Sequence, residues 1–141
     1  MTAATADGPL PLSVVTALYL RTKALHAEAE RTGIIRSLLR GEASRAGYIL
    51  FLRNLLPAYR AMERGLERHR SSPGIALLSR YRLERTLAIE TDLAALCGER
   101  WIEDIPLLAA GDIYAKRVSH AADGDGLRLI AHAYTRYLGD L

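Results

Sequence analysis

His26 and Glu30, in the stretch LHAEAE, are the side chains whose types and spacing best suit metal chemistry. On a helix, residues four apart lie on one face, a turn from each other. An imidazole serves a metal well when a carboxylate or carbonyl fixes its second ring nitrogen. His26 would then offer Nε2 to a metal while Glu30 orients Nδ1–H. The same spacing also describes an ordinary solvated His–Glu pair, which by spacing alone is the commoner case.

The other three histidines fit structural roles. His69 and His120 fall at the ends of expected helices, where a cation interacts favourably with the helix dipole. His132 stands between two alanines, as a packed core residue would. No Glu stands three residues before any histidine, so the paired Glu-x-x-His motifs of a di-iron bundle are missing. The sequence also contains no GxSxG, HExxH or Gly-rich phosphate loop, which argues against hydrolytic chemistry.

The C-terminal stretch RLIAHAYTRYLGDL offers Tyr134, Arg136, Gly139 and Asp140. Glycine inside a helix costs about 1 kcal/mol relative to alanine. It also lets the backbone approach a flat ligand closely. Gly139 would then border such a ligand, with Asp140 holding water beside it. The alternative is a C-terminal glycine cap followed by a solvated aspartate.

Helical spacing dominates the rest of the chain, and no strand-like alternation of useful length appears. Of 141 residues, 50% are hydrophobic and 25% charged, which favours one soluble all-α domain over residues 13–141 after a flexible tail at 1–12. Ser13 and Ser44 are expected to cap the first and third helices, and Pro57 to kink the third. The expected helices cover residues 14–29, 34–40, 45–69, 76–96 and 107–120, with a last one from about 127.

Charge and cysteine content restrict the partners and the compartment. The net charge of +3 is spread as alternating Arg and Glu, as in ERGLERHR, which is typical of solvated helix faces and not of a nucleic-acid surface. Cys97 is the single cysteine, so no disulfide framework exists and a reducing compartment is favoured. No secretory signal and no apolar run long enough for a membrane span is present. We therefore expect a cytoplasmic protein with no membrane span.

Four stretches together resemble the haem oxygenase family, and the likeness extends from about Val14 to Leu141. They are LYLRTKALHAEAE, GEASRAGYILFLRNLLPAYRAMERGLERH, LERTLAIETDLAALCGERW and, most specifically, LIAHAYTRYLGDL. The resemblance implies a haem-oxygenase-like helical bundle in which haem lies between a proximal N-terminal helix and a kinked distal helix.

The resemblance also implies a role for each candidate site residue. His26 matches the iron ligand and Glu30 its hydrogen-bonding partner. Gly139 matches the glycine that lets the distal backbone lie against haem, and Asp140 the carboxylate that organises distal water. The remaining matches are Tyr59 and Arg136 in the surrounding hydrogen-bond network and Tyr134 near the propionates. In addition, Tyr19 stands where many relatives carry a basic residue facing a propionate, and Arg21 or Lys23 would have to compensate.

The implied activity is oxidative cleavage of haem to biliverdin, with release of iron and carbon monoxide. Haem is then both substrate and cofactor, O2 is consumed, and a separate reductase or ferredoxin supplies electrons. Two other functions are compatible with the same fold. One is a haem-binding bundle without catalysis, and the other is a bundle that uses its apolar face for protein contacts.

In the family the final motif continues beyond the position of Leu141 with a serine and further glycines, and more helices follow. We therefore expect the C-terminal helices to be missing from this chain. The apolar face that those helices would cover is then exposed. In that case either the chain is a fragment, or another chain or a second copy covers this face through self-association.

Overall fold

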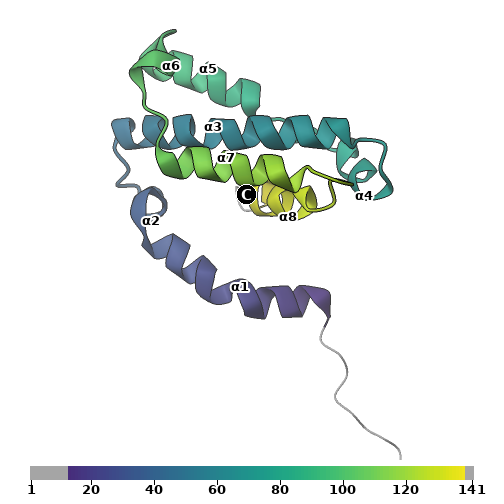
Figure 1. Cartoon of the computed structure of the whole chain (residues 1–141). Coiled ribbons are helices and arrows are strands. Elements are labelled where there is room, and N and C mark those ends of the chain that lie inside the picture. The colour runs from purple at the N-terminus through teal and green to yellow at the C-terminus, as the bar shows by residue number, and fades with distance from the viewer. Residues whose placement is uncertain (1–12, 139–141) are drawn as a thin grey trace, which may run out of the picture. The chain divides into compact units, whose positions relative to one another are not determined.

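The computed structural model describes residues 13–138 and is all-α, with no strand in that range (Figure 1). The all-α class expected from the sequence is confirmed. The chain divides into two compact units, Met1–Ala43 and Ser44–Leu141, which are described separately below. The single domain expected over residues 13–141 stays a prediction.

The first unit contains two helices, and the second contains all the others. In the first unit these are α1 (Val14–Arg31) and α2 (Gly33–Leu39). In the second they are α3 (Arg45–Arg68), α4 (Pro73–Ala76), the 3-10 turn η1 (Leu78–Arg80), α5 (Thr86–Cys97), α6 (Trp101–Asp104), α7 (Ala109–Ala121), α8 (Leu129–Ala133) and the π-helical turn η2 (Tyr134–Leu138).

Local side-chain caps fix the beginnings of α1 and α3. The Ser13 hydroxyl accepts a hydrogen bond from the Thr16 amide at 3.1 Å, and the Ser44 hydroxyl accepts one from the Gly47 amide at 3.1 Å. Each serine satisfies an amide that lacks a partner within its helix. Both caps expected from the sequence are therefore confirmed. At the first residue of α2, Gly33 adopts a φ of +53°, a left-handed conformation that favours glycine.

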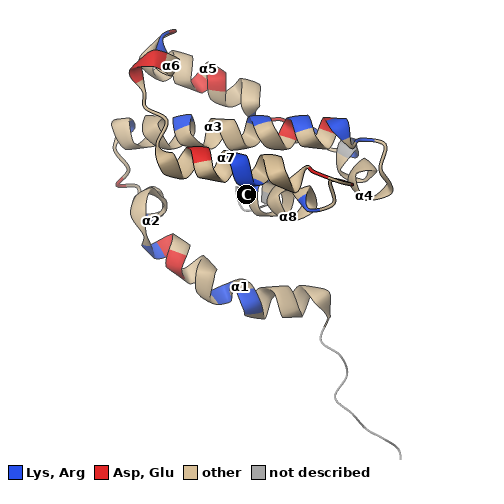
Figure 2. Ribbon diagram, viewed as in Figure 1, with Lys and Arg blue, Asp and Glu red and all other residues tan. Residues whose placement is uncertain are grey.

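The long helix α3 is the centre of the second unit, and it packs mainly on α7 and α5 (Figure 1). It continues through Pro57 as a single element. Towards its C-terminal end, basic and acidic residues alternate along the helix (Figure 2). Its apolar residues lie on the opposite side, in the core. The buried core residues of α3 are Ile49, Leu52, Leu56, Ala58, Tyr59, Ala61 and Met62.

The expected continuous helix over residues 76–96 is wrong. The chain there forms α4 and η1, then an extended stretch, and α5 begins only at Thr86. Leu78 and Leu83 both pack against the core, although five residues apart they would not share a helix face. Tertiary packing has therefore overridden the good helix propensity of the Arg and Glu residues in this stretch.

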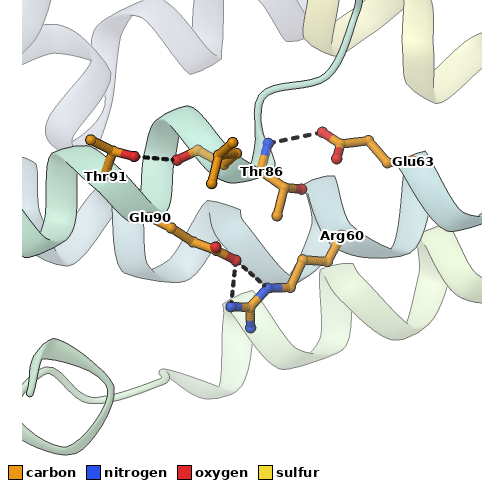
Figure 3. Close-up of polar contacts among 6 residues, drawn as sticks. Arg60, Glu63, Thr86, Glu90 and Thr91 are labelled. Atoms are coloured by element: carbon orange, nitrogen blue, oxygen red, sulfur yellow. Dashed lines mark hydrogen bonds and ion pairs between the residues drawn. The ribbon is translucent and has the colours of Figure 1, made fainter. Parts of the chain in front are cut away.

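A residue of α3 caps the beginning of α5 (Figure 3). The Glu63 carboxylate oxygen Oε1 accepts hydrogen bonds from the backbone amides of Arg85 at 2.7 Å and Thr86 at 2.9 Å. About one turn further along α5, Glu90 Oε1 forms an ion pair with Arg60 Nη2 of α3 at 2.7 Å. Two polar contacts thus join α3 to α5 from outside the core.

Asn54 of α3 likewise accepts a hydrogen bond from a backbone amide at the beginning of α7. Its Oδ1 accepts a hydrogen bond from the Leu108 amide at 2.7 Å, and its Nδ2 donates to the carbonyl oxygens of Leu50 at 2.8 Å and Pro106 at 3.2 Å. Gly111 lies directly on this side chain, since a Cβ there would be 2.7 Å from Asn54 Oδ1. The position of α7 on α3 therefore depends on a residue without a side chain at 111.

The helix expected from about residue 127 is present but changes type. It is α-helical from Leu129 to Ala133 and π-helical from Tyr134 to Leu138. Isolated π-helical turns are rare and occur frequently at functional sites. This π-helical turn contains two of the expected site residues, Tyr134 and Arg136.

Candidate functional site

In the first unit, four chemically distinctive side chains share one face of α1. Tyr19, Lys23, His26 and Glu30 recur at helical spacing, and we call them the α1 stripe. The ammonium nitrogen of Lys23 lies 5.9 Å from the centroid of the Tyr19 ring. Of the two basic residues expected to compensate for Tyr19, Lys23 is therefore the one on the Tyr19 face of α1.

The imidazole of His26 is exposed, and so is the carboxylate of Glu30. Within the described range 13–138, no hydrogen bond or ion pair occupies either ring nitrogen of His26. Its ring is accordingly open to an external ligand. The orientation of its Nδ1–H by Glu30 stays a prediction.

In the second unit, Arg136 of η2 has a partly buried guanidinium. Its Nε is buried, and it has no hydrogen-bond partner in the part of the chain that the structure describes. The guanidinium carbon lies 5.6 Å from the centroid of the Tyr114 ring on α7. This cation–π contact holds the side chain in place, and it leaves Nε–H available as a donor.

Tyr59 lies in the core with only 2% of its surface exposed. Its ring contacts that of Tyr137 on η2, with centroids 5.8 Å apart and planes tilted by 55°. This pair joins η2 to the middle of α3. Tyr134, by contrast, is 64% exposed, so the two tyrosines of η2 face different surroundings.

Tyr114 and His132 complete the surroundings of Arg136. The rings of Tyr114 and His132 have centroids 5.9 Å apart and planes tilted by 55°. Burial, together with the positive charges of Arg117 and Arg136, lowers the pKa of His132. We call Tyr114, His132 and Arg136 the Tyr114 cluster. Sequence analysis missed Tyr114, because nothing in its spacing connects it to residues some twenty positions later.

Two further histidines stand where the sequence placed them, at helix ends. His69 Nε2 is 2.8 Å from the carbonyl oxygen of Ala122, which also accepts a hydrogen bond from Arg68. His120 Nδ1 is 2.8 Å from Asp123 Oδ2. Both contacts tie helix ends to the loop that follows α7, which is a structural role.

Of the expected site residues, Tyr59 and Arg136 both lie in the second unit, where Tyr59 contacts η2 through Tyr137. Lys23, His26 and Glu30 lie together on α1 in the first unit. Gly139 and Asp140 lie outside the described residues. Among residues 13–138, no group of three or more His, Cys, Asp or Glu side chains is arranged to hold a metal ion. In the same range, no helix is both long and apolar enough to cross a membrane.

The described part of the chain is all-α, and its first helix carries an exposed histidine. The sequence model described as Heme oxygenase matches residues 12–141. The chain therefore belongs to the haem oxygenase family. The resemblance found in its motifs is thereby confirmed.

Individual relatives agree with this family. The chain is 38% identical to Heme oxygenase 1 of Homo sapiens over 133 residues, which are 94% of this chain and 46% of that protein. It is 36% identical to Heme oxygenase 1 of Nostoc sp. over 124 residues, 88% of this chain and 52% of that protein. The chain thus spans about half the length of these relatives.

A solved structure is similar as well. The crystal structure of heme oxygenase-1 from Synechocystis sp. in complex with heme matches with a TM-score of 0.81 and 32% identity. The match covers 92% of this chain and 58% of that one. The structure of heme oxygenase from Leptospira interrogans gives the same TM-score of 0.81, at 29% identity.

Proposed function

We propose that this chain carries the haem-binding and oxygen-activating part of a haem oxygenase, which cleaves haem oxidatively to biliverdin and releases iron and carbon monoxide. One observation carries the proposal: 92% of the chain matches, with a TM-score of 0.81, a relative whose structure was solved in complex with heme. Haem is the substrate in this reaction, and its iron supplies the chemistry that activates O2.

The α1 stripe suits the proximal side of haem. An exposed imidazole without a protein partner is free to bind iron, and a neutral histidine ligand leaves the opposite iron position open. Glu30, a turn further on, would accept the Nδ1–H hydrogen bond that fixes the ring. Lys23, on the same face, would pair with a carboxylate group of the substrate.

On the distal side, the roles fall to Tyr134, Arg136, Tyr59, Gly139 and Asp140. The buried Nε–H of Arg136 lacks a partner among described residues, which suits a donor to ordered water or to the substrate. Tyr59 supports η2 through Tyr137. Tyr134 is assigned to a propionate, Gly139 to the close approach of backbone to haem, and Asp140 to holding the water that delivers protons.

The partners follow from this chemistry. The reaction consumes O2 and electrons, and we assign the electrons to a separate reductase or ferredoxin, as the membership of the haem oxygenase family implies. Self-association through an exposed apolar face and a cytoplasmic location remain part of the proposal.

The test is to add hemin to the purified chain, record the Soret band, and then supply ascorbate and O2. A Soret band that decays to a biliverdin spectrum supports the proposal. A stable band would instead indicate a haem-binding module without catalysis, and the absence of any band would leave a protein-interaction bundle. The matched variant Asp140→Ala should bind haem like the parent but lose biliverdin formation, and an unchanged rate would contradict the role given to Asp140.

A further inference from the structure

The Tyr114 cluster contains a histidine to which neither the family resemblance nor the proposed function gives a role. His132 and Arg136 are four residues apart, across the junction of α8 and η2, so both project from the same side of that segment. Both contact the ring of Tyr114 on α7, the imidazole at 5.9 Å and the guanidinium at 5.6 Å from its centroid. One aromatic ring is thus shared by two side chains of a neighbouring helix.

Arg136 depends on this ring for its position. Its Nε makes no hydrogen bond within the described residues, and the contact with Tyr114 is the interaction that orients the guanidinium. The guanidinium is attracted to the face of the ring, so it follows the ring when the ring moves. The orientation of Tyr114 therefore sets the orientation of Arg136.

We propose that His132 is a positioning residue for Arg136, acting through Tyr114: by packing against the Tyr114 ring, its imidazole fixes the place of the Arg136 guanidinium. The inference rests on the proposed function in so far as Arg136 serves the haem reaction. Its structural content, the coupling of His132 to Arg136, does not depend on haem.

Electrostatics make this coupling sensitive to protonation. The groups that face His132 are Tyr114 and Arg117 of α7 and Arg136 of η2. α3 also packs on α8, where Gly65 lies against Leu129. Burial and the two guanidinium groups lower the pKa of His132, so the imidazole is neutral at neutral pH. Its protonation would add a third positive charge and a second cation on the Tyr114 ring, which weakens the hold on Arg136.

The test uses the haem-free full chain and the Nε–H signal of Arg136 in nitrogen-15 NMR spectra, assigned by its loss in Arg136→Lys. Between about pH 7.5 and about pH 5, where histidines titrate, this signal should shift with the same midpoint as His132. In His132→Phe, which keeps a ring but cannot be protonated, the signal should stay near its neutral-pH position at every pH. In His120→Phe, at the exposed end of α7, the pH response should match the parent.

A signal of Arg136 that ignores the titration of His132, or that keeps its pH response in His132→Phe, would overturn the proposal. A second measurement tests the link to the reaction, because His132→Ala should slow biliverdin formation by about tenfold to a hundredfold, the usual effect of misplacing a reacting group. His132→Phe should restore most of the rate at neutral pH, and failure to do so counts against the positioning role. If the parent forms no biliverdin while the NMR coupling is present, the proposed function fails and the positioning of Arg136 stands.

Discussion

Replacing Glu63 by alanine removes a carboxylate that caps a helix to which it does not belong. In the structure, Glu63 Oε1 accepts hydrogen bonds from the amide of Arg85 at 2.7 Å and from the amide of Thr86 at 2.9 Å (Figure 3). No other side chain in the described residues caps α5. Losing a helix cap costs about 0.5–2 kcal/mol, and two bonds to one charged acceptor favour the upper half of that range. We therefore expect Glu63→Ala to lower the free energy of unfolding by about 1–2 kcal/mol.

For a chain of this length, such a loss corresponds to a fall in Tm of about 3–6 °C. Thermal and urea unfolding monitored by circular dichroism measure it, and amide hydrogen exchange at Arg85 and Thr86 should become faster. Glu67→Ala is the matched control, because Glu67 lies a turn further along α3 and forms only an exposed ion pair with Arg70 at 3.4 Å. Equal stability of the two variants would refute the assignment of Glu63 as the cap of α5.

Two further predictions concern packing and pH. Gly111→Ala should destabilise the chain by about 1–3 kcal/mol, because its Cβ would lie 2.7 Å from Asn54 Oδ1 and 2.9 Å from the Asn54 carbonyl oxygen. Combined with Asn54→Ala the loss should be less than additive in urea unfolding, and strict additivity would contradict the contact. The lowered pKa of His132 means that the unfolded chain takes up its proton more readily than the folded chain. Its contribution to stability is complete above the unfolded pKa of about 6.5 and is lost as pH falls towards the folded pKa, so the unfolding free energy of His132→Phe should depend less on pH in that window.

The sequence was sufficient for features that depend on near neighbours. The hydroxyls of Ser13 and Ser44 cap helices that begin at the next residue, so their role is visible in a few letters of sequence. The long apolar face of α3 was predictable for the same reason, since its spacing alone specifies a helix with one buried side.

Features that depend on distant residues were not predictable in this way. The start of α5 is set by Glu63 and by the packing of Leu83, neither of which is part of that helix. In the candidate site, the spacing of His26 and Glu30 was visible in the sequence, whereas the contact of Tyr114 with Arg136 exists only because α7 and η2 pack together. The π-helical turn at Tyr134 had no signal in the apolar pattern, because that pattern fits an α-helix equally well.

The central claim is that His26 binds the iron of haem, and the ligand of the ferrous haem complex tests it most directly. Resonance Raman spectra of the reduced hemin-loaded chain should contain an iron–imidazole stretching band. His120→Ala, which removes a histidine paired with Asp123 at the end of α7, should leave that band unchanged.

In His26→Ala the band should be lost, and added imidazole should restore it by entering the space left by the side chain. The band would then report a ligand contributed by α1. Persistence of the parental band in His26→Ala, without added imidazole, would contradict the account, since another residue would then hold the iron.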